Sequence, residues 1–144
     1  MGRISESAVV AACDLRVMFS RLRRRLLEVA TDEDLTPSQT AVLIRLIKDG
    51  PASTSQLAGA ERVRPQSMAT TLVGLDRHGL IARTPDPEDG RRQLITLTRV
   101  GRTHAQNDRK VRDEWLVRAM QDRYTESERR VINEALALLE RITD

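Results

Sequence analysis

The sequence predicts a mainly α-helical domain that contains one small β-hairpin. Three observations support this prediction. Apolar residues recur at steps of three and four along most of the chain, which is the period of amphipathic helices. Capping signals and glycines divide this pattern into separate helices. Residues 80–97 instead alternate apolar and polar side chains on both sides of a turn rich in Pro and Asp, which is typical of a hairpin.

The length of the chain is that of one domain. Its 144 residues and 16.3 kDa provide a modest core, or a core that a partner chain completes, so we expect a single domain over residues 1–144. No apolar stretch reaches the roughly 18 residues that a membrane-spanning helix needs. The N-terminus also has no basic and then apolar export signal. We therefore expect a cytoplasmic protein with no membrane partner.

Metal, cofactor and enzyme chemistry find little support in the sequence. Cys13 is the one cysteine and cannot form an internal disulfide, and no cationic neighbour in the sequence activates its thiol, so we expect it to be buried and inert. His78 and His104 are too far apart for a local metal site. Glycine-rich phosphate loops and the nucleophile motifs of hydrolases are absent from the sequence. We expect neither a cofactor nor an enzyme.

The basic residues favour a nucleic-acid partner. The net charge is +3 and the pI about 9.7, and all but two of the 24 basic residues are arginine. Arginine binds phosphates and guanine edges through a planar fork of donors, but a GC-rich genome also enriches arginine, so position must decide. The three aromatic residues, Phe19, Trp115 and Tyr124, are too few to stack on single-stranded nucleic acid. Duplex DNA is the partner that remains.

The first element is a long amphipathic helix over residues 5–30. Its polar face carries five arginines, which we interpret first as a solvated face and second as a phosphate-facing patch. The apolar face comprises Ala8, Val9, Ala12, Leu15, Phe19, Leu22, Leu26 and Val29.

The second helix begins at an explicit capping signal. Thr36 is the N-cap, Pro37 takes the first helical position, and Gln39 completes a capping box. The apolar pattern that follows stops at Gly50 and Pro51, which end the helix.

Two short helices come next. Ser53 and Gln56 repeat the capping signal, and Pro65 begins a further helix that ends at Gly79, whose left-handed conformation would cap it. Only residues 59–63 join these two helices, which is the spacing of a helix-turn-helix.

A hairpin follows the helix pair. Residues 80–84 and 92–97 are predicted strands, joined by the charged turn at residues 85–90. A helix-turn-helix directly followed by a charged hairpin is the arrangement of a winged helix-turn-helix, in which the hairpin is the wing.

Two helices complete the chain. Thr98 caps a long helix that ends near residue 122, and Thr125 with Glu128 begins the last one. Inward-facing candidates on the long helix are His104, Val111, Trp115, Leu116, Ala119 and Met120. The apolar residues of the last helix are Val131, Ile132, Ala135, Leu136, Leu138, Leu139 and Ile142. Since one small domain cannot cover so much apolar surface, we expect a homodimer whose second copy covers it.

The chain resembles the multiple-antibiotic-resistance regulator (MarR) family of bacterial transcription factors. The most specific part of the resemblance is the wing, where Asp-x-x-Asp-Gly-Arg-Arg is followed by a Leu-Thr-x-x-Gly helix start. The matching segments are Leu35–Gln39, Gln56–Ala58, Val63–Met68, Leu75–Arg83, Asp86–Arg92 and Leu97–Gly101. Flanking helices of the expected length extend the resemblance over nearly the whole chain.

The resemblance implies a fold and a function. Residues 34–100 would form the winged helix-turn-helix lobe, and residues 4–30 and 101–144 the helices that interlock in a homodimer. The dimer would bind a pseudo-palindromic operator of double-stranded DNA, as a ligand-responsive repressor. Members of the family commonly sense small amphipathic or phenolic effectors in a cleft between the dimer helices and the lobe, and some sense oxidants through an N-terminal cysteine.

The second helix of the pair would be the recognition helix. Its N-terminal turn enters the major groove most deeply, where Gln pairs with adenine, Arg with guanine, and Ser or Thr with a base or a phosphate. The candidates are Arg64, Gln66, Ser67, Thr70 and Thr71, and the alternative for these side chains is ordinary helix surface.

The wing tip holds the remaining candidates for DNA binding. By resemblance to the family, Asp89 braces Arg91 while Arg91 enters the minor groove, where narrow A·T tracts concentrate negative potential. Arg92 is the second candidate for the groove contact, after Arg91. The alternative for the charged residues of the tip is that they only keep it soluble. Arg83, on the other strand, is expected either to clamp a phosphate or to pair with the acidic residues of the tip.

The alternative function is that of a helical dimeric interaction module that retains the winged helix for protein contacts. Such a module would lack arginines at the wing tip and the recognition turn, whereas this chain has Arg64, Arg91 and Arg92. His104 is expected to be structural, with a place in an effector cleft as its alternative.

Overall fold

The computed structural model describes residues 2–29 and 34–144, and it confirms a mainly helical fold with a small wing. Residue 30, where we expected the first helix to end, lies outside the described residues. The elements in order are α1 (Glu6–Val29), α2 (Pro37–Asp49), β1 (Ala52–Ser53), α3 (Thr54–Glu61), α4 (Pro65–Arg77), β2 (Ile81–Pro85), β3 (Gln93–Leu97), α5 (Arg99–Arg123) and α6 (Glu126–Leu139), followed by a 3-10 turn (Glu140–Ile142).

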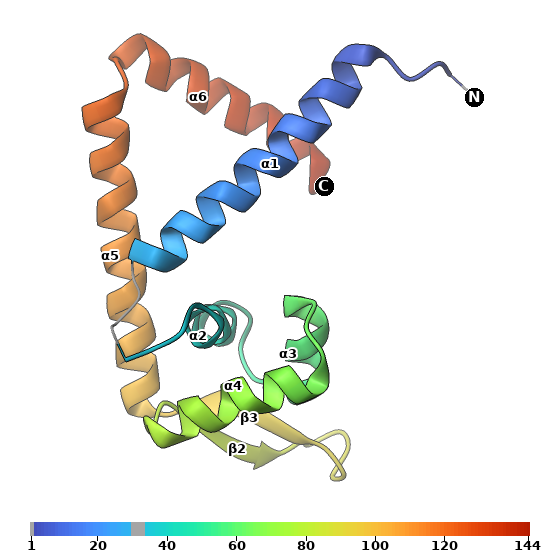
Figure 1. The fold of residues 1–144 in the computed structure, drawn as a ribbon, viewed down its shortest axis with the longest axis vertical. Helices are drawn as coiled ribbons and strands as arrows, with labels where there is room; N and C mark the ends of the chain where they lie inside the picture. The colour runs from blue at the N-terminus through green and yellow to red at the C-terminus, as the bar shows by residue number, and fades with distance from the viewer. Residues whose placement is uncertain (1, 30–33) are drawn as a thin grey trace.

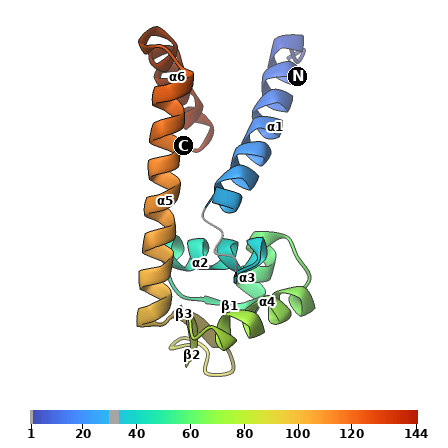
Figure 2. The same cartoon turned by 60° about the vertical axis from the view of Figure 1, so that its left-hand side comes forward.

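The helices divide into a compact lobe and three long arms. Elements α2 to β3 form the lobe at one end of the molecule, and α5 rises from it to the far end, where α6 turns back (Figure 1). Helix α1 lies above the lobe and contacts α2 and α5. A second view shows α1 and α5 as two arms on the same side of the lobe, opposite the wing (Figure 2).

The hydrophobic core lies inside the lobe. It is built from α2, α3 and α4 with the sheet beneath them and the first turns of α5. Its buried members are Leu35, Val42, Leu43, Leu46, Leu57, Ala58, Met68, Leu72, Leu75, Leu80, Ile81, Ile95 and Ala105. Helix α1 adds only Leu27 to the buried residues and α6 adds none, so a single chain leaves these two of the three arms without a core of their own.

The helix starts follow the predicted capping signals. The Thr36 hydroxyl accepts the Gln39 backbone N–H at 3.2 Å, and the Gln39 side chain accepts the Thr36 N–H at 2.9 Å. The same reciprocal pair of bonds begins α3 at Ser53 and α6 at Thr125. Each box satisfies two backbone donors that a helix N-terminus otherwise leaves open.

The sheet has three strands, not only the two that the sequence pattern predicted. Strand β3 lies between β2 and β1, and Ala52 pairs with Ile95. A strand of two residues is too short to produce an alternating pattern, and therefore periodicity could not reveal β1. The third strand ties the start of α3 directly to the wing.

A threonine and a glycine explain the Leu-Thr-x-x-Gly helix start. The Thr98 hydroxyl donates to the Gly79 carbonyl at 2.6 Å and accepts the Gly101 N–H at 3.0 Å. A Cβ atom at Gly101 would overlap the backbone carbonyl of Leu80, so only glycine allows this close approach. The motif thus fixes α5 against the turn between α4 and β2.

Two expectations about the long helices are wrong for a single chain. Val111 is exposed, and its neighbour Arg112 is buried instead, because α5 leaves the lobe and turns that face toward α1 and α2. Cys13 is exposed, since this part of α1 has no other element over it. His104 is half-buried, with its Nδ1 3.2 Å from Asp108 Oδ2, as a structural histidine would be.

Candidate nucleic-acid interface

Helix α4, the predicted recognition helix, begins with backbone donors that no side-chain cap satisfies. Its N-cap, Arg64, has extended backbone angles and no side-chain cap bond, and Pro65 has no N–H. The Met68 N–H bonds to the Arg64 carbonyl at 3.0 Å, which leaves the N–H groups of Gln66 and Ser67 at the open end of the helix. An end of this kind attracts anions such as phosphate oxygens.

The turn before α4 is tightly held. Arg62 has φ 54°, a left-handed conformation that costs on the order of 1 kcal/mol for a residue other than glycine. The N–H of Arg62 bonds to the Gly59 carbonyl at 3.3 Å, and that of Val63 to the Ala58 carbonyl at 3.0 Å. The direction of α4 is therefore coupled to the C-terminal end of α3.

Opposite faces of α4 have different surroundings. Met68, Leu72 and Leu75 are buried in the core. Helical spacing places Gln66 and Thr70 on the opposite, exposed face, together with two residues that sequence reasoning missed, Val73 and Arg77. Continuation of the four- and three-residue steps from Gln66 could have identified both.

Ser67 and Thr71 lie on the flank of α4 that turns toward the arms. Both line a hollow of about 240 Å³ together with Leu27 of α1 and Pro37 of α2. The structure therefore separates these two candidates from Gln66 and Thr70, although all four belong to the first two turns.

The threonine hydroxyls of α4 are already hydrogen-bonded. Thr70 Oγ1 donates to the Gln66 carbonyl and Thr71 Oγ1 to the Ser67 carbonyl, each at 3.1 Å. In this state each hydroxyl can only accept a further bond. A base contact by Thr70 would then require a donor, which is the amino group of adenine or cytosine.

The wing is held by an aspartate that sequence reasoning did not single out. Asp86 is buried, accepts the Glu88 N–H at 2.9 Å, and binds Arg92 through Nη2 at 2.9 Å and Nε at 3.3 Å. The Glu88 N–H and the Arg92 guanidinium lower the pKa of the Asp86 carboxyl, and Asp86 raises the pKa of Arg92. The pair therefore stays ionised into the acidic range. Its sequence signal was an aspartate and an arginine at opposite ends of the predicted turn.

The two adjacent arginines of the wing have different surroundings. Asp89 accepts the backbone N–H of Arg91 at 3.1 Å, so it holds the backbone of Arg91, and the braced guanidinium is that of Arg92. Within residues 2–29 and 34–144, the Arg91 guanidinium has no ion-pair partner. Arg91 is the side chain that is free to enter a groove.

Arg83 does not pair with the acidic residues of the tip, as one expectation had it. It forms an ion pair with Asp76 in the last turn of α4. Strand β2 follows α4 directly after the tight turn at Gly79, so Arg83 lies beside the last turn of that helix. Its use as a phosphate clamp stays a prediction.

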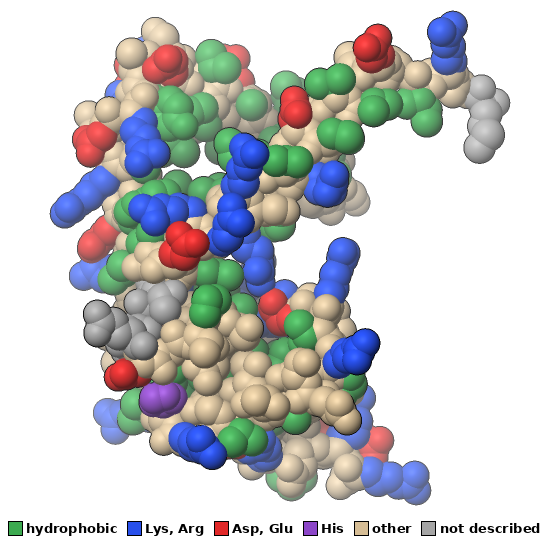
Figure 3. Space-filling view, in the orientation of Figure 1, with side chains coloured by type: hydrophobic (Ala, Val, Ile, Leu, Met, Phe, Trp, Pro, Cys, Tyr) green, Lys and Arg blue, Asp and Glu red, His purple; other side chains and the backbone are tan. Residues whose placement is uncertain are grey.

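The wing and α4 share one edge of the lobe, and basic side chains gather there (Figure 3). A further basic run follows α1, in the same view. Among the described residues, no cluster of His, Cys, Asp and Glu could hold a metal ion, and no helix there is long and apolar enough to cross a bilayer.

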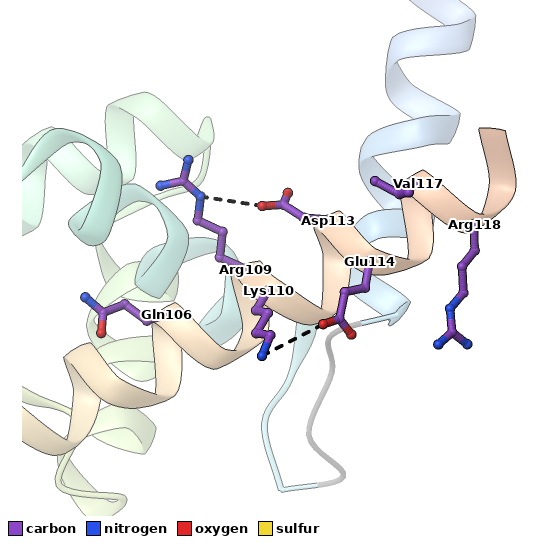
Figure 4. Close-up of a pocket in the computed structure, with 7 residues that line it drawn as sticks. All are labelled: Gln106, Arg109, Lys110, Asp113, Glu114, Val117 and Arg118. Carbon is purple, nitrogen blue, oxygen red and sulfur yellow. Dashed lines mark ion pairs between the residues drawn. The ribbon is translucent and has the colours of Figure 1, made fainter. Parts of the chain in front are cut away.

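A cleft of about 410 Å³ separates the arms from the lobe. We call it the interlobe cleft; it is lined by Phe19, Leu22, Arg23, Leu26, Leu27, Ala41, Ile44, Arg45, Lys48, Asp49, Glu61 and Arg112. A second depression lies along the outer face of α5 alone, where Arg109 pairs with Asp113 and Lys110 with Glu114 (Figure 4). These pairs are exposed on one helix, so this depression is a solvated face.

Comparisons with known proteins agree with this geometry. Residues 35–92 match the model of the MarR family. The chain is 32% identical to an uncharacterised HTH-type transcriptional regulator of Mycobacterium bovis. The alignment extends over 133 residues and covers 92% of each protein. It is 31% identical over 87 residues to the HTH-type transcriptional repressor MdtR of Bacillus subtilis, which covers 60% of this chain and 56% of MdtR.

A solved structure extends the similarity to the whole fold. The crystal structure of a proposed transcriptional regulator from Pseudomonas aeruginosa is 34% identical, covers 97% of both chains and has a TM-score of 0.80. The chain therefore belongs to the MarR family of HTH-type transcriptional regulators, a membership that implies DNA binding and no enzymatic activity.

Proposed function

We propose that the protein is a repressor that binds a pseudo-palindromic DNA operator as a homodimer. Residues 34–100 form its DNA-binding lobe, and residues 4–30 and 101–144 its dimerisation helices. The observation that carries the proposal is the edge of the lobe shared by α4 and the wing, where basic side chains gather and where Arg91 follows the hairpin turn without an ion-pair partner among the described residues. The name of the relative MdtR supports a repressor over an activator.

The exposed apolar faces of the arms support the dimer. Phe19 on α1 is 66% exposed, and Val131, Leu138 and Ile142 at the C-terminus are 64%, 55% and 70% exposed. Apolar faces of this extent on separate helices are typical of interaction surfaces. A twofold dimer would bury them and place two recognition helices on one side.

Gel-shift titration of the protein on the DNA upstream of its own gene tests this proposal. We expect binding to an inverted repeat with half-sites about one helical turn, roughly 10 bp, apart. Gln66→Ala is expected to cost about 1–3 kcal/mol at one base position and to relax the preference there. Thr103→Ala, on the exposed start of α5, is the control. Binding that is indifferent to sequence, or a footprint on a single half-site, would contradict the proposal.

An effector site in the interlobe cleft is supported by one buried cation. Arg112 is 8% exposed, and its Nη1 atom has no hydrogen-bond partner among the described residues. Burial lowers the pKa of the Arg112 guanidinium, and the nearby carboxylates of Asp108 and Asp113 act in the opposite direction. Leu22, Leu26 and Ile44 provide apolar walls beside it. We propose that the cleft takes a small amphipathic, including phenolic, molecule whose anionic group pairs with Arg112.

Benzoate is a suitable probe for this cleft. We expect it to bind the protein and weaken operator binding, whereas benzyl alcohol, which has no charge, should bind at least tenfold more weakly, about 1.4 kcal/mol. Arg112→Gln should lose the preference for benzoate, as measured by calorimetry. Arg109→Gln, on the outer face of α5, should keep it. Equal binding of benzoate to both variants would show that Arg112 is not the anion partner.

A further inference from the structure

Glu61 joins three helices through two arginines. It is the last residue of α3, and its side chain is only 12% exposed. Its Oε2 accepts a bond from Arg23 Nη2 of α1 at 2.8 Å, and its Oε1 accepts one from Arg45 Nε of α2 at 2.9 Å. Each carboxylate oxygen thus holds a different helix, and charge-assisted bonds of this length are the strong ones.

Glu61 also stands directly before the turn of the helix-turn-helix. The next residue, Arg62, has the left-handed conformation described above, and α4 begins at Pro65. The bonds of the Arg62 and Val63 amides to carbonyls of α3 make this connection stiff. A displacement of Glu61 would therefore be transmitted to the N-terminus of the recognition helix.

Arg23 links Glu61 to the arms, because it lies on α1. In the parts of the chain that the structure describes, Arg23–Glu61 is the ion pair that connects α1 to the lobe. It lies between the interlobe cleft and the hollow beside Ser67 and Thr71, since Arg23 and Glu61 line both. In a dimer held by the arms, this pair would add a charge-assisted contact to the packing of α1 and α5 on α2, which also joins the lobe to the arms.

We propose that Glu61 is a positioning residue that sets the distance and angle between the two recognition helices of the dimer, and with them the half-site spacing that the protein accepts. The inference rests on the proposed dimeric binding of an operator. Glu61 acts through Arg23 and contacts no DNA itself. Arg45 holds Glu61 from within the lobe, so that the carboxylate is already oriented toward α1.

Operators that differ only in the number of base pairs between the two half-sites test this role. Insertion or deletion of one base pair between the half-sites rotates them by about one tenth of a turn and moves them by roughly 3.4 Å. We expect the wild-type protein to prefer one spacing clearly. Glu61→Gln and Arg23→Gln should each reduce that preference at least fivefold, while the base preference that Gln66 provides stays unchanged. A residue with a merely structural role would weaken binding to all operators alike.

Three further variants serve as controls. Glu114→Gln removes an acid that also pairs with a basic side chain, Lys110 at 3.9 Å, but on the solvated outer face of α5, and should keep the wild-type spacing preference. Arg23→Lys retains the charge and should keep most of the preference. The double variant Arg23→Gln with Glu61→Gln should differ little from either single variant, because both remove the same contact.

The outcomes separate this inference from the proposed function. Half-exposed Arg23 can be replaced without creating a buried cavity, so Arg23→Gln carries the test if Glu61→Gln does not fold. If the wild-type protein discriminates between spacings and Arg23→Gln discriminates equally well, the positioning role of Glu61 is overturned and operator binding stands. If the wild-type protein binds no inverted repeat or accepts every spacing, both proposals fail.

Discussion

Leu138→Asp should convert the dimer into monomers and weaken operator binding about 100-fold or more. Leu138 is 55% exposed in the single chain, so the protomer should still fold, but a carboxylate in an apolar interface would lose its hydration without gaining a partner. A dimer binds its second half-site intramolecularly, which adds on the order of 10²–10⁴ to affinity, and a monomer loses this gain.

Light scattering and gel shifts measure the two effects. The variant should have a mass near the 16.3 kDa of one chain, and the wild-type protein twice that mass at micromolar concentration. Asn133→Asp places the same charge on another face of α6 and should leave the dimer intact. A wild-type protein that remains monomeric across this range would contradict the proposed assembly.

Arg91→Ala should weaken operator binding at least tenfold, which is about 1.4 kcal/mol. The reason is that the Arg91 guanidinium is unpaired within the described residues, so all of its charge is available to the minor groove. Loss of one cationic contact should also make the plot of log affinity against log salt shallower by about one unit. Arg92→Ala should change this slope less, because Asp86 already neutralises Arg92.

The aspartates of the wing provide the sharpest comparison. Asp89 holds the Arg91 backbone and Asp86 closes the hairpin, so Asp89→Ala and Asp86→Ala should both weaken binding although each removes a negative charge. Simple electrostatic repulsion of DNA predicts the opposite sign. Glu88→Ala, with an exposed side chain, is the matched control. Tighter binding by Asp89→Ala, with fold and dimer intact, would refute this account of the wing.

Most of the fold could be predicted from the sequence because its signals are local. The capping boxes at Thr36, Ser53 and Thr125 each involve residues three apart, and the helical period identifies the buried faces of α2 and α4. Strand β1 could not be predicted, because two residues have no period and pair with a strand about forty residues away. Cys13 is exposed because of where α1 lies relative to the other helices, and the apolar pattern of α1 does not indicate that position.

The sequence predicted which residues belong to the candidate DNA-binding site better than it predicted how they are arranged. Every proposed residue lies in α4, at its N-cap, or in the wing, but Ser67 and Thr71 face the arms, and Arg83 pairs with Asp76. Residue types and spacing indicate which side chains can bind DNA. They do not indicate which of two neighbouring arginines is neutralised, since that depends on which carboxylate the hairpin brings near.

By itself, the sequence determined the order of the helices, their ends, the wing and the family resemblance, because caps, periods and turns depend on residues a few positions apart. Only the tertiary structure decided the partners of the charged side chains. Glu61 meets Arg23 across 38 residues of sequence, and Arg112 becomes buried because α1, α2 and α5 converge on it. Such contacts depend on how separate elements pack, and local sequence carries little information about that packing.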